Sequence, residues 1–185
     1  MRVLGIAGSL RKASFNRALL RAAQELAPKE MEITVFDLAP IPPYDQDVEK
    51  EGDPGPVAAL KDAIRAADAL LFVSPEYNYG IPGVLKNAID WASRPPGKAP
   101  LNGKPAAIMG ASQGTGGTIR MQLALRQTFV FTETYALLKP EVLVARAQDK
   151  FDAEGRLTDA KTREFVGQLL AALVLWAQKF PRPSK

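Results

Sequence analysis

Short apolar runs alternate along the chain with longer segments whose apolar residues recur at helical spacing. The first run, residues 2–7, is almost continuously apolar, which is typical of a parallel strand buried on both faces. Residues 32–38 alternate apolar and polar side chains, which indicates a strand nearer the edge of a sheet. Three further strands are predicted at 69–74, 106–110 and 142–145.

Helical periodicity fills most of the segments between these strands. In residues 16–26, Leu19, Ala23 and Leu26 fall on one face of a helix. Residues 39–56 are different, because they are rich in proline and acidic residues and predict a long loop that is functional or contacts a partner. The other helices are predicted at 57–68, 83–93, 116–132 and 159–180.

The regular alternation of strands and helices predicts an α/β fold in which helices cover both faces of a parallel sheet. Right-handed connections between five strands favour a doubly wound, flavodoxin-like sheet with the strand order 2-1-3-4-5. The chain of 185 residues suits one domain, predicted at 1–180 and followed by a basic tail at 181–185.

The composition narrows the chemistry, because the chain contains neither cysteine nor histidine. Thiolate nucleophiles, imidazole bases and the common soft-metal sites are therefore excluded, and no metal site is expected. Any reaction must use carboxylates, hydroxyls, amines, backbone amides or a bound cofactor. The absence of cysteine also fits a reducing compartment.

The net charge of +4 favours anionic partners such as phosphates and dinucleotides, although it also fits a merely soluble surface. Basic residues are dispersed along the chain, so no nucleic-acid partner is expected. No targeting segment is visible, and the longest apolar run, 169–177, is about half a membrane span. A cytoplasmic protein without a membrane partner is predicted.

Three polar loops should meet at one edge of the predicted sheet. In doubly wound sheets, ligands bind beyond the carboxyl ends of the strands, where the strand order reverses. For the order 2-1-3-4-5 that point lies between the first and third strands, with the fourth beside it. The loops that leave these strands are residues 8–16, 75–80 and 112–117.

The first loop, GSLRKASFN, lacks the dinucleotide fingerprint and the P-loop motif. Ser9 and Ser14 offer hydroxyl donors, Arg11 offers a guanidinium, and the next helix presents free backbone N–H groups. Together they predict a socket for a terminal phosphate. Alternatively Ser14 is only a helix cap, which would leave Ser9, Arg11 and Asn16 unexplained.

The other two loops suit a flat ring, although each also has an ordinary structural interpretation. Residues 75–82, PEYNYGIP, bring two tyrosines and backbone amides, or simply lead into a helix that begins after Pro82. Residues 111–118, ASQGTGGT, contain glycines that allow backbone N–H groups to approach a ligand closely.

The segments GSLRKASFNRALL, SPEYNYGIPGVLKNAIDWASR and GASQGTGG resemble the NADPH-dependent FMN reductase family, whose relatives include chromate, quinone and azo-dye reductases of flavodoxin-like fold. The resemblance spans residues 1–145 and implies FMN as the cofactor. It implies that no side chain is catalytic in its own right. Glu76 either contacts the cofactor or only orients its loop. The implied cofactor-binding residues are Ser9, Arg11, Ser14 and Asn16 at the phosphate, Pro75, Glu76, Tyr77 and Asn78 at the isoalloxazine, and Ser112, Gly114 and Gly116 at its pyrimidine end.

The resemblance further implies a two-step oxidoreductase. NADPH or NADH passes a hydride to flavin N5, and a small-molecule acceptor such as a quinone, chromate, an azo compound or a flavin then takes the electrons. Neither the physiological acceptor nor the coenzyme preference follows from the sequence. Members of the family form dimers or tetramers, so a homodimer or homotetramer is expected. Residues 45–51 or the helix with Asp90 and Trp91 could supply the interface, or could be core or solvated positions.

Two other functions are compatible with parts of the sequence. A flavodoxin-type electron carrier would share the fold and FMN without NAD(P)H turnover, but such carriers are usually acidic. A non-redox nucleotide-binding or response-regulator-like module would need an acidic pocket where the first loop supplies cations.

Overall fold

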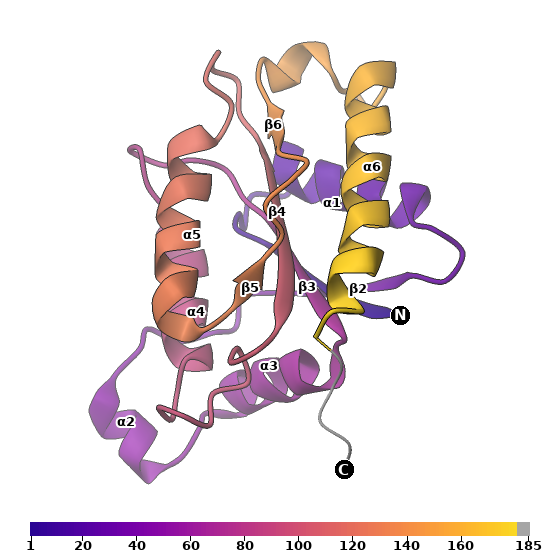
Figure 1. Cartoon of the computed structure of the whole chain (residues 1–185). Coiled ribbons are helices and arrows are strands. Elements are labelled where there is room, and N and C mark those ends of the chain that lie inside the picture. The colour runs from indigo at the N-terminus through magenta and orange to yellow at the C-terminus, as the bar shows by residue number, and fades with distance from the viewer. Residues whose placement is uncertain (181–185) are drawn as a thin grey trace.

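A parallel β-sheet forms the centre of the structure, a computed structural model that describes residues 1–180 (Figure 1). Its strands follow the order β2-β1-β3-β4-β5, and β6 also pairs with β4, which confirms the predicted α/β class and strand order. The predicted tail at 181–185 lies outside the described residues. The strands are β1 (Arg2–Ala7), β2 (Glu32–Phe36), β3 (Ala69–Val73), β4 (Pro105–Ala111), β5 (Tyr135–Ala136) and β6 (Val142–Val144).

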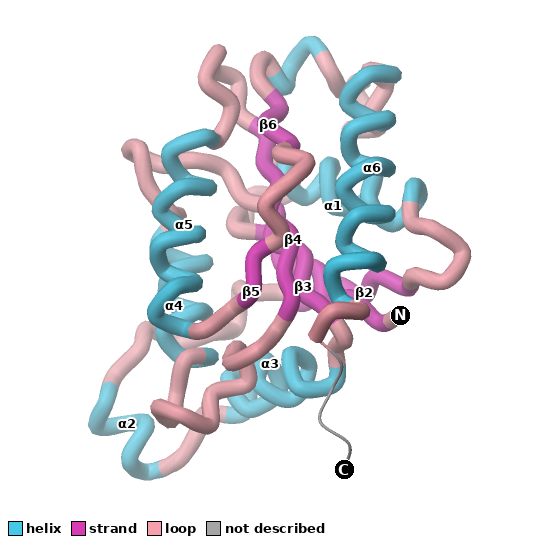
Figure 2. The backbone as a smooth tube through the Cα atoms, in the orientation of Figure 1, coloured by secondary structure: helices cyan, strands magenta, loops and turns pink. Residues whose placement is uncertain are grey.

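Helices cover both faces of this sheet, with α1 and α6 on one face and α3, α4 and α5 on the other (Figures 1 and 2). Each layer of helices packs its own hydrophobic cluster against the strands. The helices are α1 (Phe15–Leu26), α2 (Gln46–Glu51), α3 (Gly55–Ala66), α4 (Gly83–Ala92), α5 (Ile119–Thr132) and α6 (Ala160–Ala177), and a short 3₁₀ turn spans Ala147–Asp149.

The burial of the strands explains their sequence patterns. Every residue of β3 and β4 is buried, because these central strands have helices on both faces. Strand β2 is buried at Ile33 and exposed at its neighbours, as its edge position requires. Ala7 of β1 pairs with Val73 of β3, which pairs in turn with Met109 of β4. The loops that follow these strands therefore leave the sheet at one edge.

The fifth strand was predicted as one segment at 142–145 and is instead divided. Strand β5 pairs with the first residues of β4, and β6 pairs with its last residues. Pro140 lies between the two short strands and has no N–H to donate to a ladder. The predicted strand corresponds to β6, whereas β5 was missed.

The proline-rich segment 39–56 is more ordered than a loop, because it contains α2 and the first two residues of α3. It is attached to α4 through Pro42, whose carbonyl oxygen accepts hydrogen bonds from Asn87 at 2.8 Å and from the Trp91 indole at 2.9 Å. The Trp91 side chain is completely buried. Three interpretations were left open for Trp91, namely an interface, the core or a solvated position, and the structure places it in the core.

Glu49 of α2 makes a second attachment, which joins this segment to Arg94 just after α4. The Tyr44 hydroxyl donates to the Glu49 carboxylate at 2.7 Å, and Arg94 approaches the same carboxylate at 3.1 Å. The hydrogen bond from Tyr44 lowers the pKa of Glu49, and the same bond raises the pKa of Tyr44.

Among residues 1–180, none of the helices has both the length and the apolar character of a transmembrane segment.

Candidate functional site

A cavity of about 310 Å³ opens at the edge of the sheet where the loops after β1, β3 and β4 meet. This volume lies at the lower end of the range for small-molecule sites. Eight of the predicted site residues line the cavity: Ser9, Arg11, Ser14, Asn16, Pro75, Glu76, Tyr77 and Ser112. Phe15, Ala111 and Gln113 also line it and were not predicted.

Ser9 and Ser14 carry two buried hydroxyl groups in this cavity, each residue only 4% exposed. The Ser14 oxygen caps α1 by accepting from the backbone N–H of Asn16 at 3.2 Å and of Arg17 at 3.5 Å. The Ser9 oxygen accepts from the backbone N–H of Arg11 at 3.4 Å. Neither hydroxyl donates a hydrogen bond within residues 1–180, so each O–H remains available to a ligand.

Arg11 adds positive charge at the mouth of the cavity. Its guanidinium lies 6.0 Å from the centre of the Phe15 ring and forms no ion pair within residues 1–180. The N-terminus of α1, whose dipole favours anions, lies at the same place. Two hydroxyl donors, a guanidinium and a helix N-terminus fit a phosphate monoester.

Both polar atoms of the Asn16 side-chain amide form hydrogen bonds to the backbone of Ala111. Its nitrogen donates to the Ala111 carbonyl at 2.8 Å, and its oxygen accepts from the Ala111 N–H at the same distance. The side chain is buried and joins the start of α1 to the end of β4. Asn16 therefore lines the cavity as a clamp between two of its loops.

Glu76 connects the second loop to α5. One carboxylate oxygen accepts from the backbone N–H groups of Arg120 at 2.9 Å and Met121 at 3.1 Å, and the other approaches the Arg120 guanidinium at 3.2 Å. Thr118, at the N-cap position of α5, makes no side-chain capping bond. The Glu76 carboxylate takes over that capping role, and so it orients the loop as one of the two sequence interpretations expected.

The tip of the second loop is a tight hairpin turn. Tyr77 and Gly80 exchange two backbone hydrogen bonds, at 2.9 and 3.2 Å. Asn78 and Tyr79 between them both have positive φ angles, of 49° and 65°, as a type I′ turn requires. Tyr79 stacks on the Arg120 guanidinium at 3.8 Å. Asn78 lies at the tip of this turn and does not line the cavity.

The glycine-rich third loop contributes only its first residues to the cavity. Ser112 is fixed by its backbone, which accepts from the N–H of Ala147 and donates to the carbonyl of Val144, both at 2.9 Å. The carbonyl of Gly114 is directed to the Arg146 N–H at 3.1 Å. Gly114 and Gly116 lie beyond the lining residues, so the structure does not bring them to the cavity wall.

The lining residues that were not predicted carry no chemical signal in the sequence. Phe15 begins α1 and packs its ring 5.4 Å from that of Phe151, and Ala111 ends β4. Gln113 directly follows Ser112 and could have been found only by including its whole loop.

Within residues 1–180, no group of three or more acidic side chains is arranged to hold a metal ion.

Comparisons with known proteins identify the family to which the chain is similar. The family model described as NADPH-dependent FMN reductase matches residues 1–149. An NAD(P)H-dependent FMN reductase of Pseudomonas aeruginosa is 55% identical over 179 residues, which cover 97% of this chain and 96% of that protein. A quinone reductase of Escherichia coli K12 is 45% identical over 175 residues, which cover 92% of this chain and 93% of that protein.

A solved structure extends the similarity to the complete fold. The flavoenzyme NAD(P)H:(acceptor) oxidoreductase FerB from Paracoccus denitrificans superimposes with a TM-score of 0.88 at 37% identity. The match covers 97% of this chain and 98% of that one.

Proposed function

The chain belongs to the NADPH-dependent FMN reductase family, and we propose that the cavity between its three loops holds FMN in an NAD(P)H-dependent quinone reductase. FMN as cofactor, NAD(P)H as reductant and the oxidoreductase class follow from the family and from relatives matched over nearly the whole chain. The proposal adds the residues that bind the cofactor and the kind of acceptor that is reduced.

The observation that carries the proposal is the pair of buried serine hydroxyls beside Arg11. Buried polar groups normally use their hydrogen-bonding capacity, yet both hydroxyls keep an unused O–H in a cavity at a helix N-terminus. A phosphate monoester would accept from both. Ser9, Arg11 and Ser14 would bind the FMN phosphate, while Asn16 would hold that loop against β4.

The remaining loops would form the binding site of the flavin ring. When bound, FMN supplies the redox chemistry by accepting two electrons from reduced nicotinamide and passing them to the acceptor. Pro75, Glu76, Tyr77 and Ser112 would line the ring site, with Glu76 acting through the capped start of α5. Asn78, Gly114 and Gly116 stay predictions as FMN contacts.

The purified protein tests this assignment directly. We expect a yellow protein whose FMN absorbance bleaches when NADPH or NADH is added without oxygen and returns when a quinone is supplied. A colourless protein without affinity for FMN would refute the cofactor site. A protein that binds FMN but stays oxidised with both coenzymes would instead be an electron carrier of the flavodoxin type.

The acceptor proposed is a quinone, because six relatives at 39–45% identity are named as quinone reductases or as an NAD(P)H:quinone oxidoreductase. Steady-state rates with a panel of quinones, chromate, azo dyes and free flavins test this choice. The highest kcat/KM is expected for a quinone. A cytoplasmic location stays a prediction.

A homodimer or homotetramer is also proposed. It is supported by large apolar side chains that remain on the surface, among them Val130 at 81%, Phe131 at 87% and Leu138 at 67% exposure. Val130 and Leu138 line one groove, and monomers rarely expose large contiguous apolar patches.

A further inference from the structure

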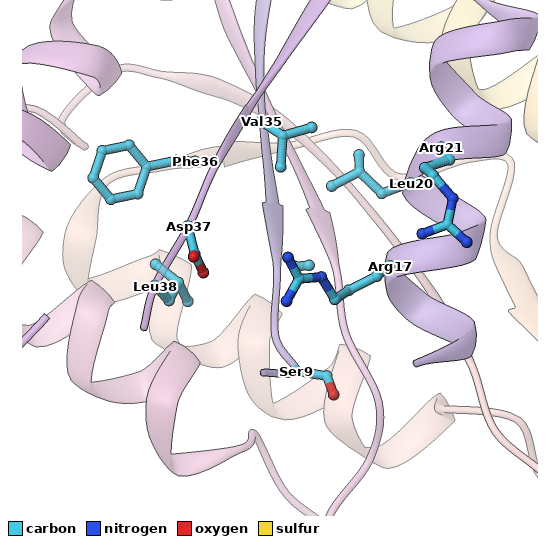
Figure 3. Close-up of a pocket in the computed structure, with 9 residues that line it drawn as sticks. Ser9, Arg17, Leu20, Arg21, Val35, Phe36, Asp37 and Leu38 are labelled. Atoms are coloured by element: carbon cyan, nitrogen blue, oxygen red, sulfur yellow. The ribbon is translucent and has the colours of Figure 1, made fainter. Parts of the chain in front are cut away.

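A second cavity, of about 170 Å³, lies between helix α1 and the carboxyl ends of β1 and β2 (Figure 3). It adjoins the proposed FMN cavity at Ser9, which lines both. The strand order places it on the β2 side of Ser9, whereas the proposed ring site lies on the β3 and β4 side. A ligand group in this second cavity would therefore lie on the far side of the proposed FMN phosphate site from the flavin ring.

Two arginines of α1 give the second cavity its positive charge. Arg17 and Arg21 are one turn apart on the same face of the helix, and in Figure 3 Arg17 extends from α1 toward Asp37. Neither arginine forms an ion pair within residues 1–180. Arg17 makes only a long contact, 3.5 Å, with the Leu10 carbonyl. Both guanidinium groups are thus available to a phosphate.

The opposite wall of the cavity is apolar and ends in a carboxylate. Val35 lies near the end of β2 and Leu20 faces it from α1, whereas the side chain of Phe36, the last residue of β2, points to the other face of the sheet. Val35 is 49% exposed although it is apolar, so a flat base could cover it. Asp37 follows β2 and accepts from the Ala39 N–H through one oxygen, which leaves the other for a hydroxyl group. In dinucleotide-binding α/β folds, an acidic residue hydrogen-bonds the ribose.

We propose that this second cavity binds the adenosine phosphate half of a dinucleotide whose other half lies in the flavin site, as part of FAD, or against the bound flavin, as in NADPH. Arg17 and Arg21 bind its phosphate, Asp37 its ribose, and the apolar wall its base. The volume of about 170 Å³ suits one part of a dinucleotide and not a complete one. The inference rests on the proposed function. NADPH and FAD both carry this chemical group, and the experiment distinguishes them.

The primary test measures the affinity of the protein for the adenosine phosphate group itself. The probe is adenosine 2′,5′-bisphosphate, titrated by calorimetry into the FMN-loaded protein. We expect saturable binding that becomes about tenfold weaker in Arg17→Gln and in Arg21→Gln, since each removes one charge-assisted contact. Arg65→Gln, on α3 across the sheet, is the matched control and should keep the wild-type affinity. Arg21→Gln is decisive if Arg17→Gln disturbs the neighbouring loop.

Two further measurements identify the source of the adenosine phosphate. If it is NADPH, the arginine variants raise the KM for NADPH about tenfold and the KM for NADH less, with kcat within about twofold of wild type. If it is FAD, the variants weaken FAD binding about tenfold and leave the affinity for FMN unchanged. Either result supports the second cavity as a dinucleotide subsite.

Absence of probe binding, or equal affinities in wild type and both arginine variants, would overturn the inference. Probe binding without any change in NADPH kinetics or FAD affinity would overturn it as well. Bleaching of the FMN-loaded protein by excess NADH reports on the proposed function separately, because it needs bound FMN and reduced nicotinamide whether or not the second cavity binds the adenosine phosphate half. The two proposals can therefore fail independently.

Discussion

At the scale of single residues, the two cavity serines serve structure and binding through different atoms. The Ser14 oxygen accepts the backbone bonds that start α1, and the Ser9 oxygen accepts from Arg11. A hydroxyl that accepts through its lone pairs still has one proton to donate. The two sequence interpretations of Ser14, helix cap and phosphate ligand, are therefore compatible, and replacing Ser9 separates binding from helix capping.

We predict that Ser9→Ala weakens FMN binding about tenfold to a hundredfold, because one hydrogen bond to a charged phosphate is lost. The free energy of unfolding of the apoprotein should change little, since Ser9 caps no helix. Fluorescence titration with FMN and urea unfolding measure the two effects. Ser93→Ala, at the far end of α4 from the cavity, is the control. An FMN affinity of Ser9→Ala within twofold of wild type would contradict the phosphate assignment.

Gly110 marks a place where the backbones behind two cavity loops approach closely. An added Cβ would lie 2.3 Å from the Ser74 carbonyl oxygen and 2.4 Å from the Thr118 hydroxyl. We predict that Gly110→Ala lowers the free energy of unfolding by about 1–3 kcal/mol and weakens FMN binding, because the strand ends must separate. Urea unfolding and FMN titration measure both. Gly167→Ala in α6 meets no neighbouring atom and should stabilise by about 0.5–1 kcal/mol. Equal stabilities of the two variants would refute this steric account.

At the scale of secondary structure, the pattern of apolar residues was sufficient to predict most helices and strands. It failed for the elements that exist because of tertiary contacts. The buried strands β3 and β4 are apolar throughout, and β1 is apolar after Arg2, so all three could be predicted. Strand β5 has only two residues and exists because Lys104 and Ala106 offer backbone partners, which no local pattern encodes. Helix α2 has no buried residue, so it carries no apolar periodicity, and contacts such as that of Glu49 with Arg94 hold it in place.

Helix α6 provides a prediction about pH. Hydrogen bonds from the Thr162 hydroxyl at 2.5 Å, Lys150 at 2.9 Å and the Thr162 N–H at 2.9 Å lower the pKa of the capping Asp159 from 3.8 to about 2. A lowered pKa means that the folded state favours the ionised carboxylate. Its contribution is complete above the unfolded pKa of 3.8 and is lost as pH falls toward about 2.

Asp159→Asn isolates this charge, because asparagine also caps helices. We predict that wild type is more stable than the variant by about 1–2 kcal/mol at pH 7, after solvent screening is considered. Urea unfolding of both proteins should give a constant difference between pH 7 and 5 that shrinks below pH 4. A difference that stays unchanged down to pH 3 would show that the charge of Asp159 is not responsible.

At the scale of the whole molecule, topology explains why the site could be located before its geometry was known. The order 2-1-3-4-5 requires the loops after β1, β3 and β4 to meet, and the eight predicted residues that line the cavity come from them. Loop conformation explains why the other predicted site residues do not line the cavity. Asn78 was predicted from its motif as a residue that binds FMN; the positive φ angles of the turn place it at the hairpin tip, outside the cavity lining, and its contact with FMN stays a prediction. The Arg17–Asp37 cavity was missed because its residues come from α1 and the end of β2, which no single motif joins.

The surface of the molecule leads to the last prediction, which concerns assembly. Val130 and Leu138 line a groove of about 640 Å³ between the end of α5, β5 and the end of α6. We expect light scattering to give the mass of a dimer or tetramer, because a second copy would cover these apolar side chains. The double variant Val130→Asp with Leu138→Asp should shift the mass toward the monomer. Leu175→Asp, at a position that is 65% exposed and not among the residues that line the groove, should retain the wild-type mass. A monomeric wild type, or a double variant that assembles normally, would show that this groove is not the interface.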